Sequence, residues 1–213
     1  MNLQTLASHT VDLDLLPEAP IVLDAGCRWF DFTKALSDKR PAAWIVAMDP
    51  ASDVIFNNRG VANARALGID AVVTYVDAAL VGTGRAQQRL AHFSTGEGDF
   101  LTTQGYFPGW DIQPKIYDVE CFNIGEVMLM HGVKHFDLVK LDIEGSEFGV
   151  LENWPGPVAT QISVEFHDWD KAQYNHVYYE RLWKALPSYK VIQHKLSLQG
   201  SGMGHWDTLL TLR

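Results

Sequence analysis

The chain has 213 residues, of which 47% are hydrophobic and 20% are charged, ordinary values for a globular domain that buries roughly 70% of its unfolded surface. A net charge of −9 argues against a nucleic-acid partner, because a phosphate backbone requires a basic surface. Cys27 and Cys121 are isolated, and residues 1–20 carry neither a basic segment nor a long apolar run. We therefore expect a cytoplasmic protein without a disulfide framework, signal peptide or membrane span.

Apolar runs alternate with helical stretches from residue 21 onward, which predicts one α/β domain over residues 21–213. Residues 1–20 are treated as an N-terminal extension. Residues 82–116 are rich in Gly and Thr and are interpreted as an irregular insertion of loops with room for a hairpin. In the first half of the chain, strands are predicted at residues 21–24, 44–48 and 71–76, and a short helix at 31–36.

The second half continues the alternation and adds a clear helix boundary. Asn123 is expected to cap a helix, because Glu126 sits at its N3 position and Gly132 follows as a stop. The last two predicted strands flank a glycine-containing turn, so they form a hairpin that makes the sheet mixed. The predicted elements are helices at 124–131, from 147 and at 169–186, and strands at 136–141, 161–168, 190–198 and 206–212.

Residues 137–151, DLVKLDIEGSEFGVL, place charge on a strand that should be apolar. Because side chains alternate faces along a strand, Lys140, Asp142 and Glu144 project from one side. The strand at 161–168 repeats the pattern with Glu165 and His167. One interpretation is two edge strands, each with a wet face. A strand–helix–strand order instead implies parallel neighbours covered on both faces, where charge must be paired or used. We therefore favour a site that joins both polar faces.

Acidic residues also close most of the predicted strands. The strand ends are Asp24-Ala25-Gly26, Asp49, Asp77, Asp142 and Glu165. In open α/β sheets, ligands bind beyond these carboxyl ends, and an acidic residue after the second strand accepts ribose hydroxyls. The chain lacks a GxGxxG motif after the first strand and a P-loop, so a pyrophosphate ligand is disfavoured. S-adenosylmethionine, which carries a ribose and a cationic centre, fits this acidic rim better.

With these motifs the chain resembles an FkbM-type S-adenosylmethionine-dependent methyltransferase of the class I Rossmann-like fold. The resemblance rests on DLVKLDIEGSEFGVL with ISVEFHD, and on three motifs that many methyltransferases share, IVLDAG at 21–26, MDP at 48–50 and VDAAL at 76–80. It covers the chain from about residue 21 to its end. It implies a mostly parallel seven-stranded sheet with an antiparallel last strand and helices on both faces.

The resemblance also implies roles for the cofactor-binding residues. Asp24 and the backbone of Gly26 and Cys27 should face the methionine portion of the cofactor. Asp49, followed by Pro50, should hold the ribose, and Asp77 with Ala78 should border the adenine. The chain departs from the family at Phe30, where members usually keep a second glycine. A phenylalanine there would either narrow the methionine pocket or pack beneath a shifted loop.

Methyl transfer to a hydroxyl requires alignment of the acceptor with the methyl group and removal of a proton. Candidate bases are Asp142, Glu144, Glu165 and His167, and the ordinary pKa of histidine suits a base near neutrality. Lys140 is expected to pair with a carboxylate on the neighbouring strand. An alternative makes Asp142, Glu165 and His167 the ligands of Mg²⁺ or Mn²⁺, and an internal ion-pair network competes with it.

The predicted activity is O-methylation of a hydroxyl on a small molecule, sugar or glycan. The sequence LDIEG stands where DNA amino-methyltransferases usually carry an Asn/Asp-Pro-Pro-aromatic motif, which again disfavours nucleic acid. Two other classes stay open, namely a non-catalytic binding protein of the same fold, favoured by Phe30, and a nucleotide-binding enzyme of another reaction class. Aromatic side chains proposed to wall the acceptor site are Tyr106, Phe107, Trp110, Trp169, His205 and Trp206.

Overall fold

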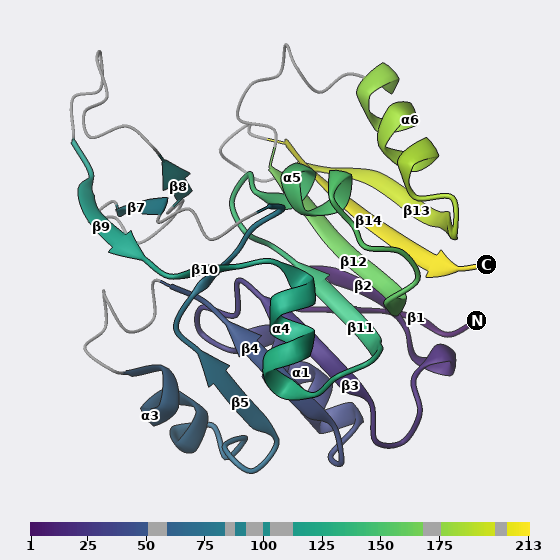
Figure 1. Ribbon diagram of the computed structural model, residues 1–213. Helices are drawn as coiled ribbons and strands as arrows, with labels where there is room; N and C mark the ends of the chain where they lie inside the picture. The colour runs from purple at the N-terminus through teal and green to yellow at the C-terminus, as the bar shows by residue number, and fades with distance from the viewer. Residues whose placement is uncertain (51–58, 84–87, 93–99, 103–112, 168–175, 199–203) are drawn as a thin grey trace.

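The computed structural model describes residues 1–50, 59–83, 88–92, 100–102, 113–167, 176–198 and 204–213. Its centre is a seven-stranded sheet in the order β5-β4-β3-β11-β12-β14-β13 (Figure 1). The strands are β3 (Ile21–Ala25), β4 (Trp44–Met48), β5 (Val73–Val76), β11 (Phe136–Leu141), β12 (Ala159–His167), β13 (Tyr189–Leu198) and β14 (Gly204–Leu212).

The sheet is mixed because of one reversed strand. β5, β4, β3, β11 and β12 run parallel to one another, whereas β14 is antiparallel to both β12 and β13. The predicted sheet with an antiparallel last strand is therefore confirmed. β5 begins at Val73, two residues later than expected.

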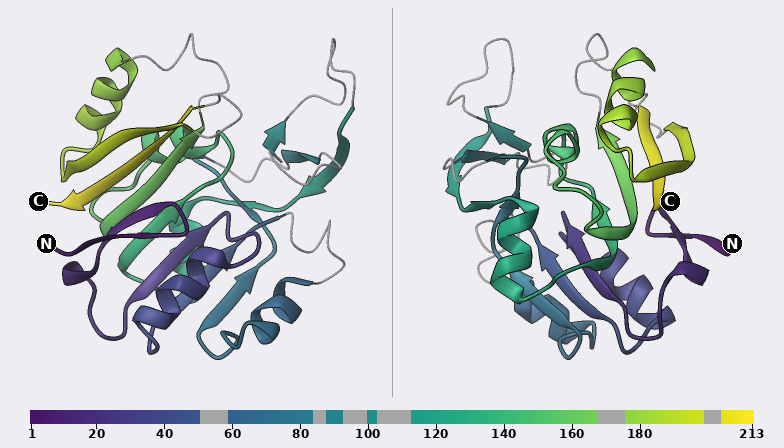
Figure 2. Two further views of the ribbon diagram at one scale, coloured as in Figure 1. Left: turned by 180° about the vertical axis from the view of Figure 1, so that it is seen from behind. Right: turned by 45° about the vertical axis from the view of Figure 1, so that its right-hand side comes forward.

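Helices cover both faces of this sheet (Figure 2). Val22 and Leu138 point to one face, where α1 (Asp31–Lys39) supplies Phe32 to the core, and α3 (Arg59–Ala66) packs farther along the same face. Their sequence neighbours Leu23 and Val139 point to the opposite face. That face is covered by α4 (Ile124–His131), α5 (Glu147–Glu152) and α6 (His176–Ala185). None of the described helices has the length and apolar content needed to cross a bilayer.

The boundaries of α4 follow the sequence signals. The Asn123 side chain accepts a hydrogen bond from the Glu126 N–H at 3.0 Å, and the Glu126 carboxylate accepts one from the Asn123 N–H at 2.9 Å. This capping box satisfies two N–H groups that the helix leaves unbonded. Gly132 ends the helix in the left-handed conformation with φ 66°. By contrast, α6 begins at His176, and the start of its predicted helix lies outside the described residues.

The N-terminal residues form a hairpin that sequence analysis did not predict. β1 (Leu3–Leu6) pairs with β2 (His9–Asp12), and all four residues of β2 are buried. The side-chain amide of Gln161 accepts from the Asp12 N–H at 3.0 Å and donates to the Asp12 carbonyl at 3.1 Å. The hairpin therefore covers the polar face of β12. The sequence HTVD does not indicate a buried strand, because buried polar residues give no alternating hydrophobic pattern.

The segment predicted to be loops with room for a hairpin contains regular strands, two of which form an antiparallel pair. β7 (Gln88–His92), β8 (Phe100–Thr102) and β9 (Lys115–Val119) form a three-stranded antiparallel sheet. Beside it, β6 (Ala79–Leu80) pairs in parallel with β10 (Cys121–Phe122). This smaller sheet lies on the β5 side of the molecule (Figures 1 and 2). Buried Leu90 joins it to the walls of the cleft described below.

Candidate active site

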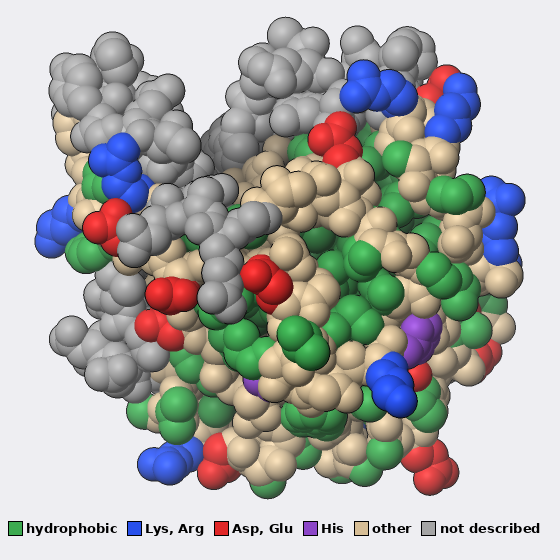
Figure 3. All heavy atoms as spheres, viewed as in Figure 1, with side chains coloured by type: hydrophobic (Ala, Val, Ile, Leu, Met, Phe, Trp, Pro, Cys, Tyr) green, Lys and Arg blue, Asp and Glu red, His purple; other side chains and the backbone are tan. Residues whose placement is uncertain are grey.

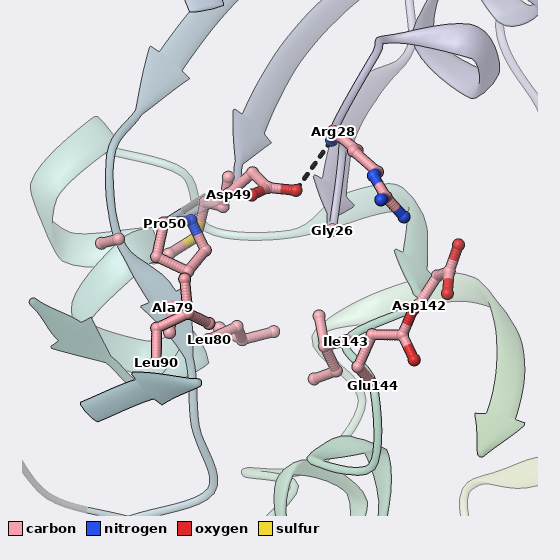
Figure 4. Close-up of a pocket in the computed structure, with 12 residues that line it drawn as sticks. Gly26, Arg28, Asp49, Pro50, Ala79, Leu80, Leu90, Asp142, Ile143 and Glu144 are labelled. Atoms are coloured by element: carbon pink, nitrogen blue, oxygen red, sulfur yellow. Dashed lines mark hydrogen bonds between the residues drawn. The ribbon is translucent and has the colours of Figure 1, made fainter. Parts of the chain in front are cut away.

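A cleft lies at the carboxyl ends of β3, β4 and β11 (Figure 4). This is where ligands bind in open α/β sheets. Its lining residues are Gly26, Arg28, Met48, Asp49, Pro50, Ala78, Ala79, Leu80, Leu90, Asp142, Ile143 and Glu144.

Gly26 forms the turn that brings two strand ends together. It has φ +79°, a left-handed conformation that glycine adopts without steric cost. A Cβ at this position would lie 1.7 Å from the carbonyl oxygen of Asp142. The N–H groups of Gly26 and Cys27 both donate to the Met48 carbonyl, at 2.8 and 3.2 Å. The N–H groups of the backbone predicted to face the cofactor are therefore already hydrogen-bonded to the end of β4.

Asp49 follows β4 and is fixed by the same turn. Its carboxylate accepts a hydrogen bond from the Arg28 N–H at 2.8 Å, and its carbonyl accepts one from the Tyr75 hydroxyl. Among the lining residues Arg28 is the only basic one, and Figure 4 shows its guanidinium between Asp49 and Asp142. One wall of the cleft thus carries both an acidic side chain and a basic one.

A buried ion pair links β3 to β11 beneath the cleft. Lys140 Nζ donates to the Gly26 carbonyl at 2.6 Å and lies 3.2 Å from Asp24 Oδ1 and 3.4 Å from Asp142 Oδ2. Burial opposes the charge on Lys140, but the carboxylates of Asp24 and Asp142 outweigh it and raise the pKa of this amine. Lys140 pairs with the neighbouring strand as expected. It holds Asp142 together with the turn at residues 26–28, which is named the cofactor turn after the role that the sequence predicts for it.

Glu147 fixes the loop that follows β11. It is fully buried, and its carboxylate accepts hydrogen bonds from the N–H groups of Ile143, at 2.9 Å, and Gly145, at 3.0 Å. The same carboxylate lies 2.9 Å from His167 Nδ1. His167 Nε2 then faces Asp142 Oδ1 at 3.6 Å and Glu144 Oε2 at 3.5 Å. The predicted merging of the two polar strand faces is therefore seen, with Glu147 as an additional anchor.

The pKa values of Asp142 and Glu144 are shifted in opposite directions although both carboxyls line the cleft. Burial would raise the pKa of Asp142, but Lys140 and His9 reverse this effect and hold it far below its usual range. Burial raises the pKa of Glu144 to about 7, and the neighbouring Asp142 adds to the shift. Opposite shifts of this kind separate an ionised group from a proton-exchanging one.

His167 holds its proton at neutral pH. Burial alone would lower its pKa, but Glu147, Glu144 and Asp142 raise it to about 10. A histidine that stays protonated is a poor base near neutrality. Because Nδ1 is held by Glu147, His167 is oriented with its second N–H toward the two cleft carboxylates.

The proposed metal ligands do not form the expected set. Within the described part of the chain, ligand atoms gather as His9 with Asp142 and Glu165, and as Asp142 with Glu144 and His167. Both groups contain Asp142, whose carboxylate already faces Lys140 and His167. The geometry favours the ion-pair network over the predicted Asp142–Glu165–His167 triad.

The remaining predicted cofactor residues divide by location. Pro50 and Ala78 line the cleft, whereas Asp24, Cys27 and Asp77 are not among its lining residues. Asp24 is fully buried and accepts a hydrogen bond from the Thr33 hydroxyl at 2.5 Å. Cys27 is buried in the core beside α3, and burial raises its pKa well above the ordinary value. Asp77 is exposed.

Phe30 does not narrow the cleft. Its ring is fully buried against Ala47 and Ala64, and it meets Tyr75 edge-on with centroids 6.0 Å apart. Its backbone is left-handed, with φ 64°, the conformation for which glycine is best suited. Phe30 therefore has a backbone conformation that is unfavourable for a residue with a Cβ, while its ring makes a buried aromatic contact with Tyr75. The side chain packs beneath the loop.

The predicted aromatic wall of the acceptor site is largely untested. Tyr106, Phe107, Trp110 and Trp169 lie outside the described residues. Trp206 stacks on His194 with ring centroids 4.5 Å apart and packs against the core on the α6 face. It therefore belongs to the core and not to the cleft.

Three residues of this region were missed by sequence analysis. Glu147 stands at the start of a predicted helix, Arg28 follows the first predicted strand, and His9 lies in the N-terminal extension, but none of the three was predicted to belong to the site. Arg28 carries a usable signal, because it directly follows the glycine turn after the first strand. His9 carries none, since its role depends on the docking of the hairpin.

Solved structures define the class of fold. The chain resembles M. capricolum TrmK in complex with S-adenosyl-homocysteine, with 11% identity, 95% of this chain and 69% of that chain covered, and a TM-score of 0.54. An rRNA methylase from Streptococcus thermophilus covers 93% of this chain and 90% of its own at 11% identity and a TM-score of 0.51. The fold is therefore that of an α/β methyltransferase.

The family follows from the sequence match. Residues 18–192 match the methyltransferase FkbM domain, and the chain belongs to that family of S-adenosylmethionine-dependent methyltransferases. The FkbM methyltransferase from Methylobacillus flagellatus is similar in structure, with 13% identity and a TM-score of 0.50. The alignment covers 94% of this chain and 46% of that protein, so this chain spans less than half of its length. No curated protein sequence matches the chain.

Proposed function

We propose that this protein transfers the methyl group of S-adenosylmethionine to a hydroxyl of a small molecule or carbohydrate, and that the fold is of the class I Rossmann-like type. The observation that carries the proposal is Glu144, a cleft carboxyl with a pKa of about 7. Such a group can take a proton from a hydroxyl near neutral pH. Beside it stands Asp142, which remains ionised and held in place.

The cofactor is expected to lie along the wall formed by the ends of β3 and β4. Asp49 accepts the ribose hydroxyls, and Ala78 borders the adenine in the apolar part of the cleft. The methionine portion then extends past Gly26, where Arg28 is suited to its carboxylate. This course directs the methyl group toward Asp142 and Glu144.

The reaction is an in-line displacement at the methyl carbon. The acceptor oxygen attacks that carbon, the carbon–sulfur bond breaks, and its electron pair neutralises the sulfonium. Glu144 takes the proton that the hydroxyl loses. His167 and Glu147 hold Glu144 and the loop before α5 in position. The proposed reaction uses no metal ion at Asp142, because the carboxylate of this residue already faces the cationic side chains of Lys140 and His167.

Charge supports a small acceptor over a polyanionic one. The chain carries a net charge of −9, and three of the lining residues are acidic against one basic. On the face shown in Figure 3, the visible Lys and Arg side chains lie mostly toward the edges of the view and are interspersed with Asp and Glu. An rRNA methylase shares the fold, but the fold does not determine the acceptor. The alternative of a non-catalytic binding protein was favoured by Phe30, and Phe30 does not line the cleft.

Asp49→Ala tests cofactor binding. When the concentration of S-adenosyl-homocysteine is a hundred times its dissociation constant, the wild-type protein should gain about 2.7 kcal/mol in its free energy of unfolding. The variant loses the ribose acceptor, so its affinity should fall about a hundredfold by calorimetry, in line with the loss of two charge-assisted hydrogen bonds. Asp38→Ala removes an exposed carboxylate paired with Lys34 and should bind normally. Absence of binding by the wild type would overturn the cofactor assignment, and normal binding by Asp49→Ala would overturn the ribose assignment.

Glu144→Gln tests the base. Transfer of labelled methyl groups to a panel of monosaccharides and hydroxylated aromatic compounds should fall about a hundredfold or more, while binding of S-adenosyl-homocysteine stays within twofold. In the wild type, the rate should rise with pH and level off above about 7, because Glu144 must lose its proton to act. Glu165→Gln is the comparison. If that variant loses activity and Glu144→Gln retains it, the base is Glu165.

A further inference from the structure

The N-terminal hairpin lies outside the segment that matches the family, which begins at residue 18, yet it is firmly attached to the catalytic sheet. The Thr10 hydroxyl donates to Asp207 at 2.8 Å, and the Gln193 amide donates to both Thr10 and Asp207. Together with the Gln161 clamp on Asp12, these bonds fix β2 against β12 and β14. The hairpin is thus held over the polar face of the sheet.

His9 is the residue that the hairpin carries toward the site. Its side chain is 1% exposed, and its ring meets Phe32 edge-on at 5.6 Å between centroids. His9 Nε2 lies 3.4 Å from Asp142 Oδ2 and 3.9 Å from Glu165 Oε2, and Nδ1 lies 3.5 Å from the Ser163 hydroxyl. The next residue back, Ser8, donates to the same Glu165 oxygen at 3.1 Å.

These contacts connect the hairpin with the cofactor turn. Asp142 Oδ2 faces both His9 and Lys140 at 3.4 Å, and Lys140 donates to the Gly26 carbonyl at 2.6 Å. The backbone carbonyl of Asp142 in turn packs directly on Gly26. Asp142 Oδ2 is therefore held from two sides, by β11 itself through Lys140 and by the hairpin through His9.

We propose that the N-terminal hairpin is a working part of the active site, and that His9 is a positioning residue that holds Asp142, and through it the cofactor turn, in the binding arrangement. This inference rests on the proposed function, since it assumes that the cleft binds S-adenosylmethionine. It assigns to residues 3–12 a role that the family-matched segment alone does not contain.

The test measures binding of S-adenosyl-homocysteine by calorimetry to the full chain. His9→Phe keeps an aromatic ring against Phe32 but removes both nitrogens, and it should weaken binding about tenfold. His9→Gln places an amide nitrogen at similar reach and should restore binding to within about threefold of wild type. Leu36→Ala is the matched control, because it loosens the core cluster against which β2 packs and removes none of the groups that face Asp142. It should bind within twofold of wild type.

A double-substitution cycle separates positioning from general loosening. In an Asp142→Asn background, His9→Phe should weaken binding no further, because the group through which it acts has been changed. Additive losses, or a loss of affinity in Leu36→Ala equal to that in His9→Phe, would overturn the inference. Should the wild type not bind the ligand, the proposed function fails instead. The contact between His9 and Asp142 is then tested by long-range ¹H–¹⁵N spectra of the histidine rings in the wild type and in Asp142→Asn. If the chemical shifts of the His9 ring nitrogens are the same in both proteins, the contact is absent.

Discussion

Gly26→Ala should abolish binding of S-adenosyl-homocysteine and destabilise the protein by more than about 4 kcal/mol, the range reserved for severe steric change. The new Cβ would lie 1.7 Å from the Asp142 carbonyl oxygen and 2.8 Å from its carbon. Both are backbone atoms, so no side-chain rotation relieves the clash. Either the turn after β3 or the end of β11 must move, and both contribute residues that line the cleft. The φ of +79° adds strain for any residue with a Cβ.

Gly132→Ala provides the matched control. This glycine also has a left-handed backbone, with φ +66°, but nothing lies within 4 Å of its ideal Cβ position. Its replacement should cost about 1–2 kcal/mol from backbone strain and leave ligand affinity unchanged. Urea unfolding and calorimetry on the two variants would isolate the effect of the close approach. Equal losses of stability in both would show that the contact between Gly26 and Asp142 matters little.

The part of the fold that the sequence predicted depends on local patterns. β3 and β11 are apolar runs with residues such as Leu23 and Val139 buried on one face and Val22 on the other. The caps of α4 are also encoded locally, by Asn123 and its neighbours. In contrast, β2 is buried by polar contacts with distant strands. No window of its own sequence contains that information.

The candidate site was predicted as a group, but individual roles were not. Alternation along β11 correctly placed Lys140 near the carboxylates. The same rule, applied to β3, puts Asp24 on the face of Val22, beneath α1, where Thr33 and Lys140 bind it. The pattern of acidic strand ends does not distinguish a carboxylate that enters the cleft from one that faces a helix. That distinction depends on which side chains the other strands and helices bring to each face.

The charge states of the site residues likewise cannot be predicted from the local sequence. Asp142 and Glu144 are two residues apart and have the same chemistry, but the fold surrounds the first with Lys140, His9 and His167. Glu144 receives less compensation and is the group whose pKa approaches 7. Because His167 is bound to Glu147, the histidine that looked like the best base becomes a proton-holding partner.

Lys140→Met should destabilise the protein by about 3–5 kcal/mol, because removing one partner of a buried pair leaves the other charge uncompensated. Lys140 is 2% exposed, and Asp24 is fully buried. The ammonium group is also the donor to the Gly26 carbonyl, so affinity for S-adenosyl-homocysteine should fall together with stability. Urea unfolding measures the first effect and calorimetry the second. As a control, Lys34→Met breaks the more exposed pair with Asp38 and should cost less than about 1 kcal/mol.

The combination Lys140→Met with Asp24→Asn gives the decisive comparison. If the cost of the single change is the stranded charge on Asp24, neutralising that group should recover a large share of the lost stability. Affinity for the ligand should not recover with it, since the donor to Gly26 and the partner of Asp142 are still missing. A double variant as unstable as the single one would point to lost packing by the lysine stem. Recovery of stability without recovery of binding would show that this buried charge maintains the arrangement of the site more than the fold.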